Sequence, residues 1–429
     1  MELLRKLQQR EASKNPVSVG IIGCGQMGSG LAHTINNIKG MQVNAISDID
    51  PERAIRTLLE MGVQKNNIKE VSKINEANDA LRNGKRLVSA DAMLLTDLEK
   101  IEANVEATGV PDVGASIALA SIEKKKPIVM LNVETDITIG ALLNQKARQN
   151  EALYTVASGD EPGVCKMLYE QAVLMGFEVV CIGKGKNNPL DFYATPDSCR
   201  EEAIGKDMNP KILASFKDGT KTMVEMAAVS NATGLLPDVP GMHGPKVELE
   251  ELLHVYKPKV DGGIFTTRGT VDYSTGKIAP GVFLIVYSAD KRIQKEMDFI
   301  THAAGPFYLL FRPYHLCDLE TPQSIAEAVL LNEVTVVAEN MNSEVVAVAK
   351  RDLKAGEQLK GIGSADMFGR IYSYKEARKM KTIPIGIAEK GVVLTDIKKG
   401  DPLTEYNCSA DESKLIYNLR KEQDKIFKV

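Results

Sequence analysis

The first 160 residues of the chain alternate short apolar runs with longer amphipathic stretches. Short β-branched runs that end in glycine or a polar residue are typical of buried strands, and the stretches between them have helical periodicity. A regular alternation of strand and helix predicts a parallel, doubly wound α/β sheet of the Rossmann type. We expect strands at residues 17–23, 42–48, 103–109, 127–132 and 153–158, helices at 26–39, 51–62, 113–126 and 138–150, and a polar insertion at 64–90.

The pattern changes after Pro162. Helical and extended segments now alternate less regularly, and a long polar stretch separates them. Residues 260–290 are typical of antiparallel strands, in which the sequence DYSTGKIA predicts a hairpin turn. This segment predicts a mixed α+β domain for substrate binding and dimerisation, with helices at 163–176, 222–234 and 324–341 and a strand at 177–186.

Two segments near the C-terminus share a sequence skeleton. Residues 345–363 contain AKRDLKAGEQL and residues 391–407 contain LTDIKKGDPL, each with an apolar residue in a charged stretch, then glycine, an acid and leucine. This weak internal repeat predicts a small, mostly β domain, followed by a charged terminal helix at 414–429. The predicted division is therefore residues 1–160, 161–342 and 343–429.

The composition excludes several classes of function. The net charge of −4 provides no basic field for nucleic acid, and the absence of tryptophan with only 5% aromatic residues leaves few side chains for base stacking. Even the longest apolar runs have only strand length, and the charged N-terminus is unlike a signal peptide, so we expect a cytoplasmic protein without a membrane segment. The six scattered cysteines form no CxxC pair, which argues against a zinc cluster or a disulfide framework.

A GxGxxG motif follows the first predicted strand and opens the first predicted helix. Its glycines allow a tight turn, close approach of a pyrophosphate and packing of helix on strand, so it predicts a dinucleotide site; the alternative is a tight turn without nucleotide. Asp48, at the end of the second strand, favours a ribose hydroxyl and NAD, whereas Arg53 could hold a 2′-phosphate and favour NADP. The residues expected at the cofactor from the motif are Gly23, Gly25, Gln26, Met27 and Gly28.

Short polar residues follow two later strands of the same predicted sheet. Thr108 and Gly109 lie at the carboxyl end of one strand, and Asn132 and Glu134 at the carboxyl end of the next. Ligands bind at the carboxyl ends of strands in doubly wound sheets, so we expect these four residues at the nicotinamide. The alternative is that they are ordinary helix caps.

Paired carboxylates lie on the loop SGDEPG at residues 158–163. Asp160 and Glu161 could bind a divalent metal or act as an acid–base pair, or Asp160 could simply cap the following helix. In the polar stretch after this loop, Lys184, Lys186 and Lys221 suit a phosphate or carboxylate substrate and proton transfer.

His243 lies in the loop PGMHGP, where a helix face is not expected. It is a candidate acid or base, or a metal ligand. Glu320, which follows the loop Arg312–His315, is a further candidate metal ligand. The remaining histidines have no ligand spacing, and His33 in the first helix is expected to be structural.

The segments GIIGCGQMGSGLA and EATGVPDVGASIALASIEKKKPIVMLN resemble the nucleotide-binding domain of homoserine dehydrogenase. That family has an Asn-Lys pair after the strand, whereas Val133 follows Asn132 here, and no lysine matches its catalytic lysine. A resemblance over nearly the whole chain is to the deoxyxylulose phosphate reductoisomerase-like family, through SGDEPGVCKMLYEQAVLMGFEVVCIGKGK, SFKDGTKTMVEMAAVSNATGLLPDVPGMHGP, GTVDYSTGKIAPGVFLIV and RPYHLCDLETPQSIA. The repeat resembles the SAF domain that ends its members.

This second resemblance implies an NADPH-dependent reductoisomerase that converts 1-deoxy-D-xylulose 5-phosphate to 2-C-methyl-D-erythritol 4-phosphate with magnesium or manganese. Asp160, Glu161 and Glu320 would then hold the metal, and Lys184, Lys186 or Lys221 the phosphate, in a homodimer. Two alternatives stay open. One is an NAD(P)-dependent dehydrogenase of a hydroxy acid or sugar acid, and the other is a non-enzymatic assembly factor, which the SAF-like repeat would suit.

Overall fold

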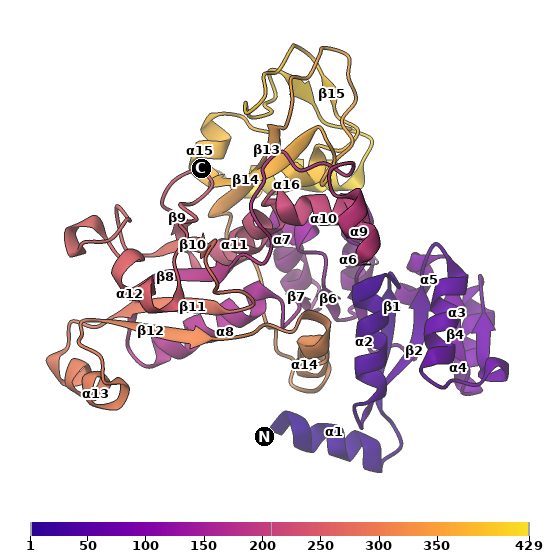
Figure 1. Ribbon diagram of the computed structural model, residues 1–429. Coiled ribbons are helices and arrows are strands. Elements are labelled where there is room, and N and C mark those ends of the chain that lie inside the picture. Colours follow the sequence, from indigo (N-terminus) through magenta and orange to yellow (C-terminus); the bar gives the residue numbers. More distant parts are fainter. Residues whose placement is uncertain (1, 207, 428–429) are drawn as a thin grey trace. The chain divides into compact units, whose positions relative to one another are not determined.

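The computed structural model describes residues 2–206 and 208–427 and is shown in Figure 1. Contacts group the chain into two compact units. Unit one comprises the residues up to Gly163 together with Leu316–Val337. Unit two comprises Val164–His315 and the residues from Ala338 onward. These two units are defined by contacts and do not test the predicted division into three consecutive domains, which stays a prediction.

Unit one is built on a seven-stranded sheet in which all pairs are parallel. Along the sheet the order is β3-β4-β2-β1-β5-β6-β7, so the chain moves one way from β1 to β2 and the other way from β5 to β7. The predicted doubly wound α/β fold is confirmed, with its switch point between β1 and β5. The strands are β1 Val17–Ile22, β2 Met41–Ser47, β3 Ile68–Glu70, β4 Arg86–Ser89, β5 Ala103–Glu106, β6 Ile128–Met130 and β7 Tyr154–Val156.

Helices cover both faces of this sheet, because right-handed crossovers that run in opposite directions put their helices on opposite faces. A helix from late in the chain, α14 (Cys317–Leu330), packs against α2 and β5, and its Ile325 and Ala326 join the core around Val19. The chain thus returns to unit one to complete its core. The other helices are α1 Glu2–Ala12, α2 Gln26–Asn36, α3 Pro51–Glu60, α4 Ile74–Arg82, α5 Ala92–Asp97, α6 Pro111–Glu123 and α7 Val133–Gln149.

Two sequence predictions for unit one are wrong. Residues 64–90 are not an insertion, because β3 and β4 extend the sheet beyond β2. Only Leu87 and Val88 supply apolar character to β4, which is too short a run to indicate a strand. The helix predicted at 324–341 ends at Leu330. Val336 lies beyond this end and forms an isolated β-bridge with Val156. The residues around Val336 are β-branched, and such residues favour extended backbone over helix.

Unit two contains a mixed five-stranded sheet in the order β12-β11-β8-β10-β9. The predicted hairpin at DYSTGKIA is wrong: β10 and β11 do not pair, since β8 lies between them, parallel to β10 and antiparallel to β11. The elements are α8 Glu161–Leu174, β8 Glu178–Gly185, α9 Arg200–Gly205, α10 Pro210–Lys217, α11 Thr220–Thr233, β9 Leu236–Pro237, α12 Leu252–Val255, β10 Thr270–Ser274, β11 Val282–Tyr287, α13 Lys291–Thr301 and β12 Phe307–Arg312.

The last part of unit two contains the repeat. Here β13 pairs antiparallel with β14, and α11 packs against both strands. Short 3-10 turns occur at Lys65–Asn67, Leu249–Glu251, Lys259–Asp261 and Ile385–Ile387. The remaining elements are β13 Ser343–Ala349, β14 Met367–Ser373, α15 Tyr374–Lys379, β15 Val392–Val393, β16 Cys408–Ser409 and α16 Leu415–Ile426.

The two copies of the repeat pair with each other at equivalent positions. Leu353 and Ile397 exchange backbone hydrogen bonds of 2.9 and 3.0 Å. Lys354 Nζ lies 2.7 Å from Asp396, and the equivalent Lys398 Nζ lies 2.9 Å from Asp352. Each contact therefore recurs with the partners exchanged, which is the signature of a local pseudo-two-fold axis.

A membrane-spanning helix would have to be both long and apolar, and none of the helices in the described parts of the chain is.

Candidate functional site

The glycine loop joins β1 to α2 and shows three different needs for glycine. A Cβ on Gly23 (φ +94°) would lie 2.7 Å from the Ala107 carbonyl carbon, and one on Gly28 would overlap the Gly23 carbonyl oxygen. A Cβ on Gly25 would meet nothing within 4 Å. The first and third glycines are thus required by the fold, while the second leaves open space at the N-terminus of α2, where an anion is favoured. Gln26 and Met27 form the first turn of this helix.

Asp48 closes this loop from the end of β2. Its carboxylate accepts hydrogen bonds from the backbone N–H groups of Cys24 (2.7 Å) and Asp50 (2.9 Å), and the residue is almost fully buried. Arg53 Nη1 lies 4.0 Å from the same carboxylate, and the Arg53 side chain is half exposed. The structure therefore places Asp48 and Arg53, the two side chains predicted to contact the ribose or its 2′-phosphate, beside the glycine loop.

The end of β5 carries an acid that the sequence analysis did not single out. Glu106 is fully buried, and its Oε1 accepts hydrogen bonds from the Thr108 backbone N–H (2.8 Å) and from Thr108 Oγ1. Burial raises the pKa of the Glu106 carboxyl to about 7. Gly109, with φ +67°, follows in the left-handed region. Glu106 thus fixes the residues predicted to contact the nicotinamide.

The residues after β6 lie beside this group. Asn132 caps α7 by accepting a hydrogen bond from the Thr135 N–H (3.2 Å), and Glu134 lies in the first turn of that helix. Asp136, one position beyond Thr135, is buried and accepts a hydrogen bond from Tyr154 Oη (2.9 Å), and burial raises the pKa of its carboxyl to about 7. Asp136 and Tyr154 thus form a buried contact with each other.

The loop after β7 is held by the start of α14. Ser158 Oγ donates to the Glu320 carbonyl (2.7 Å), and the Gly159 carbonyl accepts from the Cys317 N–H (2.8 Å). Gly159, at φ +84°, has no room for a side chain, since a Cβ would lie 2.7 Å from the Cys317 carbonyl. Asp160 and Glu161 are buried, and Cys317 Sγ lies 3.7 Å from Asp160 Oδ1. Unit one therefore brings the predicted ligand Glu320 to the loop that carries the other two.

In unit two, the predicted Lys184 and Lys186 are buried and Lys221 is half-buried. Lys184, on β8, forms an ion pair with Glu225 of α11, which the sequence analysis missed. Lys186 Nζ donates to the Phe216 carbonyl (2.7 Å), and burial, aided by the charge of Lys184, lowers the pKa of Lys186 to about 8. Lys221 lies four residues before Glu225 and so shares its helix face.

His243 is held by two acids that the sequence analysis also missed. Its Nε2 lies 2.8 Å from Asp238 Oδ2, while Asp238 Oδ1 accepts a hydrogen bond from the Thr266 N–H (2.9 Å). The His243 backbone N–H donates to the buried Asp272 (3.0 Å), and burial raises the pKa of Asp272 to about 6. The imidazole remains partly exposed, so a carboxylate-oriented histidine faces solvent here.

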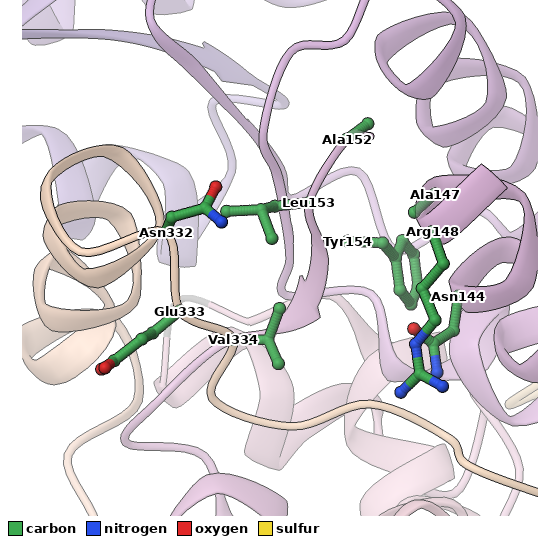
Figure 2. Close-up of a pocket in the computed structure, with 9 residues that line it drawn as sticks. All are labelled: Asn144, Ala147, Arg148, Ala152, Leu153, Tyr154, Asn332, Glu333 and Val334. Carbon is green, nitrogen blue, oxygen red and sulfur yellow. The ribbon is translucent and has the colours of Figure 1, made fainter. Parts of the chain in front are cut away.

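A cavity of about 410 Å³ opens elsewhere in unit one, at the amino end of β7 (Figure 2). Figure 2 shows Tyr154 with Asn144 and Arg148 of α7 on one side, and Asn332 and Val334 on the other. The predicted cofactor and metal residues of this unit follow the carboxyl ends of strands instead, and none of them lines the cavity. The cavity is therefore distinct from the predicted cofactor and metal sites.

Two of the acids that sequence reasoning missed share one property. Glu106 and Asp272 are single acids within apolar strand sequences, ANVE and TVDYS, and an acid at such a position is the available signal, because a buried charge is costly and rarely kept without a role. Asp238 lies five residues before His243 but reaches it only because the intervening loop turns back, with Gly241 and Met242 at positive φ. That turn is a tertiary feature without a simple sequence signal.

Comparison with known proteins gives one family match. Residues 159–321 match the family model described as oxidoreductase DRL, catalytic domain. No curated protein matches the chain significantly.

Solved structures with similar folds are dehydrogenases and a reductoisomerase. A probable dehydrogenase from Thermotoga maritima is 12% identical, covers 74% of this chain and 90% of its own, and has a TM-score of 0.43. Scyllo-inositol dehydrogenase from Lactobacillus casei is 13% identical, covers 76% and 92%, and has a TM-score of 0.42. A DOX-P reductoisomerase with fosmidomycin and magnesium is 16% identical, covers 49% and 56%, and has a TM-score of 0.35.

The chain joins a doubly wound sheet with a GxGxxG loop to a segment that matches an oxidoreductase catalytic domain. It is an oxidoreductase.

Proposed function

We propose that the chain is an NADPH-dependent reductase or reductoisomerase of a phosphorylated sugar, and that its substrate is 1-deoxy-D-xylulose 5-phosphate, converted to 2-C-methyl-D-erythritol 4-phosphate. One observation carries the proposal. The match to the oxidoreductase DRL catalytic domain over residues 159–321 contains every residue that the sequence marked as catalytic or metal-binding: Asp160, Glu161, Lys184, Lys186, Lys221, His243 and Glu320.

The chemistry of these residues supports the proposal. Lys221 on α11 and Lys184 on β8, which pairs with Glu225 of α11, would supply cationic groups for a phosphate or a developing oxyanion. His243, oriented by Asp238, would move a proton at a substrate hydroxyl. The nicotinamide would supply the hydride that reduces the rearranged carbonyl.

Asp160, Glu161 and Glu320 would hold a divalent cation. All three offer carboxylate oxygens, the donors that magnesium and manganese prefer, and Asp160 and Glu161 are buried, where a carboxylate gains most from a cation. A bound cation would stabilise negative charge on the substrate oxygens during isomerisation. Chelation by EDTA should then abolish turnover, and added Mg²⁺ or Mn²⁺ should restore it.

The direct test is NADPH oxidation by the purified protein with 1-deoxy-D-xylulose 5-phosphate. Turnover that depends on metal supports the proposal. Absence of turnover with this sugar, together with NAD(P) reduction by a hydroxy acid or sugar acid, would contradict it and select a dehydrogenase. A panel of phosphorylated and unphosphorylated sugars with both cofactors distinguishes the two results.

Single substitutions test which residues take part in the reaction. Replacing His243 by Ala, Asp238 by Asn or Glu161 by Gln should lower turnover by about a hundredfold while cofactor affinity changes little. His254→Ala is the matched control, since His254 is exposed, and it should retain full turnover. If the His243 variant is as active as the His254 variant, His243 is not part of the reaction.

Cofactor choice is tested by binding alone. We expect NADPH to bind more tightly than NADH because Arg53 is half exposed beside the ribose site, and Arg53→Ala should reduce this preference about tenfold. Gly25→Ala should weaken both nucleotides without loss of stability, whereas Gly28→Ala should destabilise the fold itself. Equal affinities for NADPH and NADH in the unaltered protein would rule out the NADPH preference.

We also propose that the protein is a homodimer and that the repeat forms a SAF-like domain. The reciprocal pairing of residues 353 and 397 supports a two-copy module, which is the feature that the resemblance to a SAF domain rested on. Sedimentation equilibrium measures the oligomeric state, and a monomer at micromolar concentration would contradict the dimer.

A further inference from the structure

Glu106 connects two loops of the nucleotide site through one side chain. Its Oε1 accepts two hydrogen bonds from Thr108, one from the backbone N–H (2.8 Å) and one from the hydroxyl. These bonds fix the second residue after the strand in a tight turn, and Gly109 follows at positive φ. The conformation of Thr108 and Gly109 therefore depends on an acceptor at position 106.

The same turn lies directly under the glycine loop. Glu106 pairs in register with Ile22, the last residue of β1, and the Ala107 N–H donates to the Ile22 carbonyl (2.8 Å). The backbone of Ala107 and Thr108 occupies the space where a Cβ of Gly23 would be. β1 and β5 flank the switch point of the sheet, where a dinucleotide crosses from one half to the other. A change in the Thr108 turn would thus reach both halves of the nucleotide.

The second oxygen of Glu106 faces polar atoms without a cation. An ideal Cβ on Gly114 would lie 2.9 Å from Glu106 Oε2 and 2.8 Å from Asn132 Nδ2, so the missing side chain makes room for these groups. The titratable groups that act on Glu106 are Glu134 from α7 and Tyr154 from β7, and neither is positively charged. The buried carboxylate is held by hydrogen bonds alone.

We propose that Glu106 is a positioning residue of the nucleotide site, which as a carboxylate holds Thr108 and Gly109 in the shape that receives the nicotinamide half of the dinucleotide, and which on protonation releases that shape. The proposal rests on dinucleotide binding and not on the identity of the sugar. Because burial brings the pKa of this carboxyl to about 7, the change falls within the working pH range. Affinity should fall as the pH is lowered through 7 and should level off above it.

The experiment measures NADP⁺ binding by calorimetry between pH 5.5 and 8.5, without substrate. We expect unaltered protein to lose about tenfold in affinity across this range. Glu106→Gln should bind with little dependence on pH, because the amide oxygen remains an acceptor for Thr108 but does not titrate. Glu106→Ala should bind about tenfold more weakly at every pH, and Thr108→Val should show a smaller loss.

Asp136→Asn is the matched control. Asp136 is a fully buried carboxylate in the same unit whose pKa is also raised to about 7, but it contacts Tyr154 and not Thr108. This variant should retain both the affinity and the pH profile of the unaltered protein, including any titration of the NADP⁺ phosphate itself. If Glu106→Gln and Asp136→Asn have the same pH profile, the proposal is wrong. It is also wrong if Thr108→Val binds as tightly as the unaltered protein, and this variant decides the matter if Glu106→Ala does not fold.

Discussion

Several buried acids are held differently in the two units. In unit one, Glu106 and Asp136 are fully buried and accept hydrogen bonds only from uncharged groups, so burial raises the pKa of each to about 7. In unit two, three buried acids lie against buried cations, in the pairs Lys184–Glu225, Lys350–Asp218 and Arg420–Glu344, while Asp272 is held by backbone N–H groups like the acids of unit one. Acids of the first kind change charge near neutral pH, whereas those of the second kind form ion pairs that hold distant segments together.

The difference predicts where function and where structure reside. A hydrogen-bonded acid that titrates near pH 7 can move a proton or change a loop, at a modest cost in stability. A buried ion pair contributes little net stability against an apolar alternative, but removal of one partner leaves a buried charge without compensation. Glu106 and Asp136 should therefore make unit one respond to pH, and the ion pairs of unit two should be sensitive to the loss of a single charge.

The largest expected loss of stability from a single substitution is at the Arg420–Glu344 pair. Both side chains are almost inaccessible, and two guanidinium nitrogens of Arg420, in α16, lie 2.5 and 2.6 Å from the Glu344 oxygens on β13. Glu344→Gln leaves the guanidinium buried opposite a neutral amide, with Asp424, 2.8 Å from Arg420 Nε, as a remaining carboxylate. We therefore expect the free energy of unfolding to fall by about 3 kcal/mol. Urea denaturation of the full chain measures this change.

The double variant Glu344→Leu with Arg420→Met is the control for this prediction. It removes both charges together, so it should recover most of the lost stability. A double variant that is no more stable than Glu344→Gln would mean that shape, and not the uncompensated charge, determines the effect.

The second prediction concerns Asp136 and the stability of unit one. Its carboxyl has a pKa of about 7 in the folded protein and 3.8 as its ordinary value, so between these values the folded state binds more protons than the unfolded state. The contribution of Asp136 to stability is therefore full below about pH 4, falls as the pH rises to 7, and is constant above. The difference across this window is about 4 kcal/mol.

Asp136→Asn removes this contribution to the pH dependence. We expect the variant to lose less stability than the unaltered protein when the pH is raised from 4.5 to 7.5, as measured by urea denaturation at each pH. Asp79→Asn, at an exposed position of α4, should leave the pH dependence unchanged. Parallel curves for unaltered protein and Asp136→Asn would contradict the raised pKa.

The sequence predicted the parts of the fold that local pattern controls. The glycine motif, its flanking strand and helix, and Asp48 all lie within about thirty residues, and the structure assembles them as the spacing requires. The repeat was also visible, because each copy keeps its apolar residue, glycine and acid at the same spacing.

The failures concern contacts between distant segments. The insertion of β8 between β10 and β11 joins residues about ninety positions apart, so the local DYSTGKIA turn signal gave a hairpin that does not form. The return of α14 to unit one is equally non-local. Candidate lysines were recognised by type, but their burial and their partners, such as Glu225, depend on packing that no local pattern describes.

The smallest expected effect tests the pseudo-two-fold axis of the repeat. Gly356 and Gly400 have φ of +87° and +90°, and a Cβ on either would meet nothing within 4 Å. Substitution by alanine should therefore cost only backbone strain, about 1–2 kcal/mol of unfolding free energy, and should cost the same at both positions.

Lys354→Ala and Lys398→Ala are the matched controls for these glycines. Each removes one of the two equivalent ion pairs at the surface, where screening leaves little net stabilisation, so both should be nearly neutral and equal. Unequal losses for the two glycines would show that the copies have diverged in energy although they pair symmetrically. Equal losses of unfolding free energy would mean that the two copies of the repeat contribute equally to stability. Together with neutral lysine variants, they would also mean that this module depends on backbone geometry more than on any single charge, unlike the buried ion pairs of unit two.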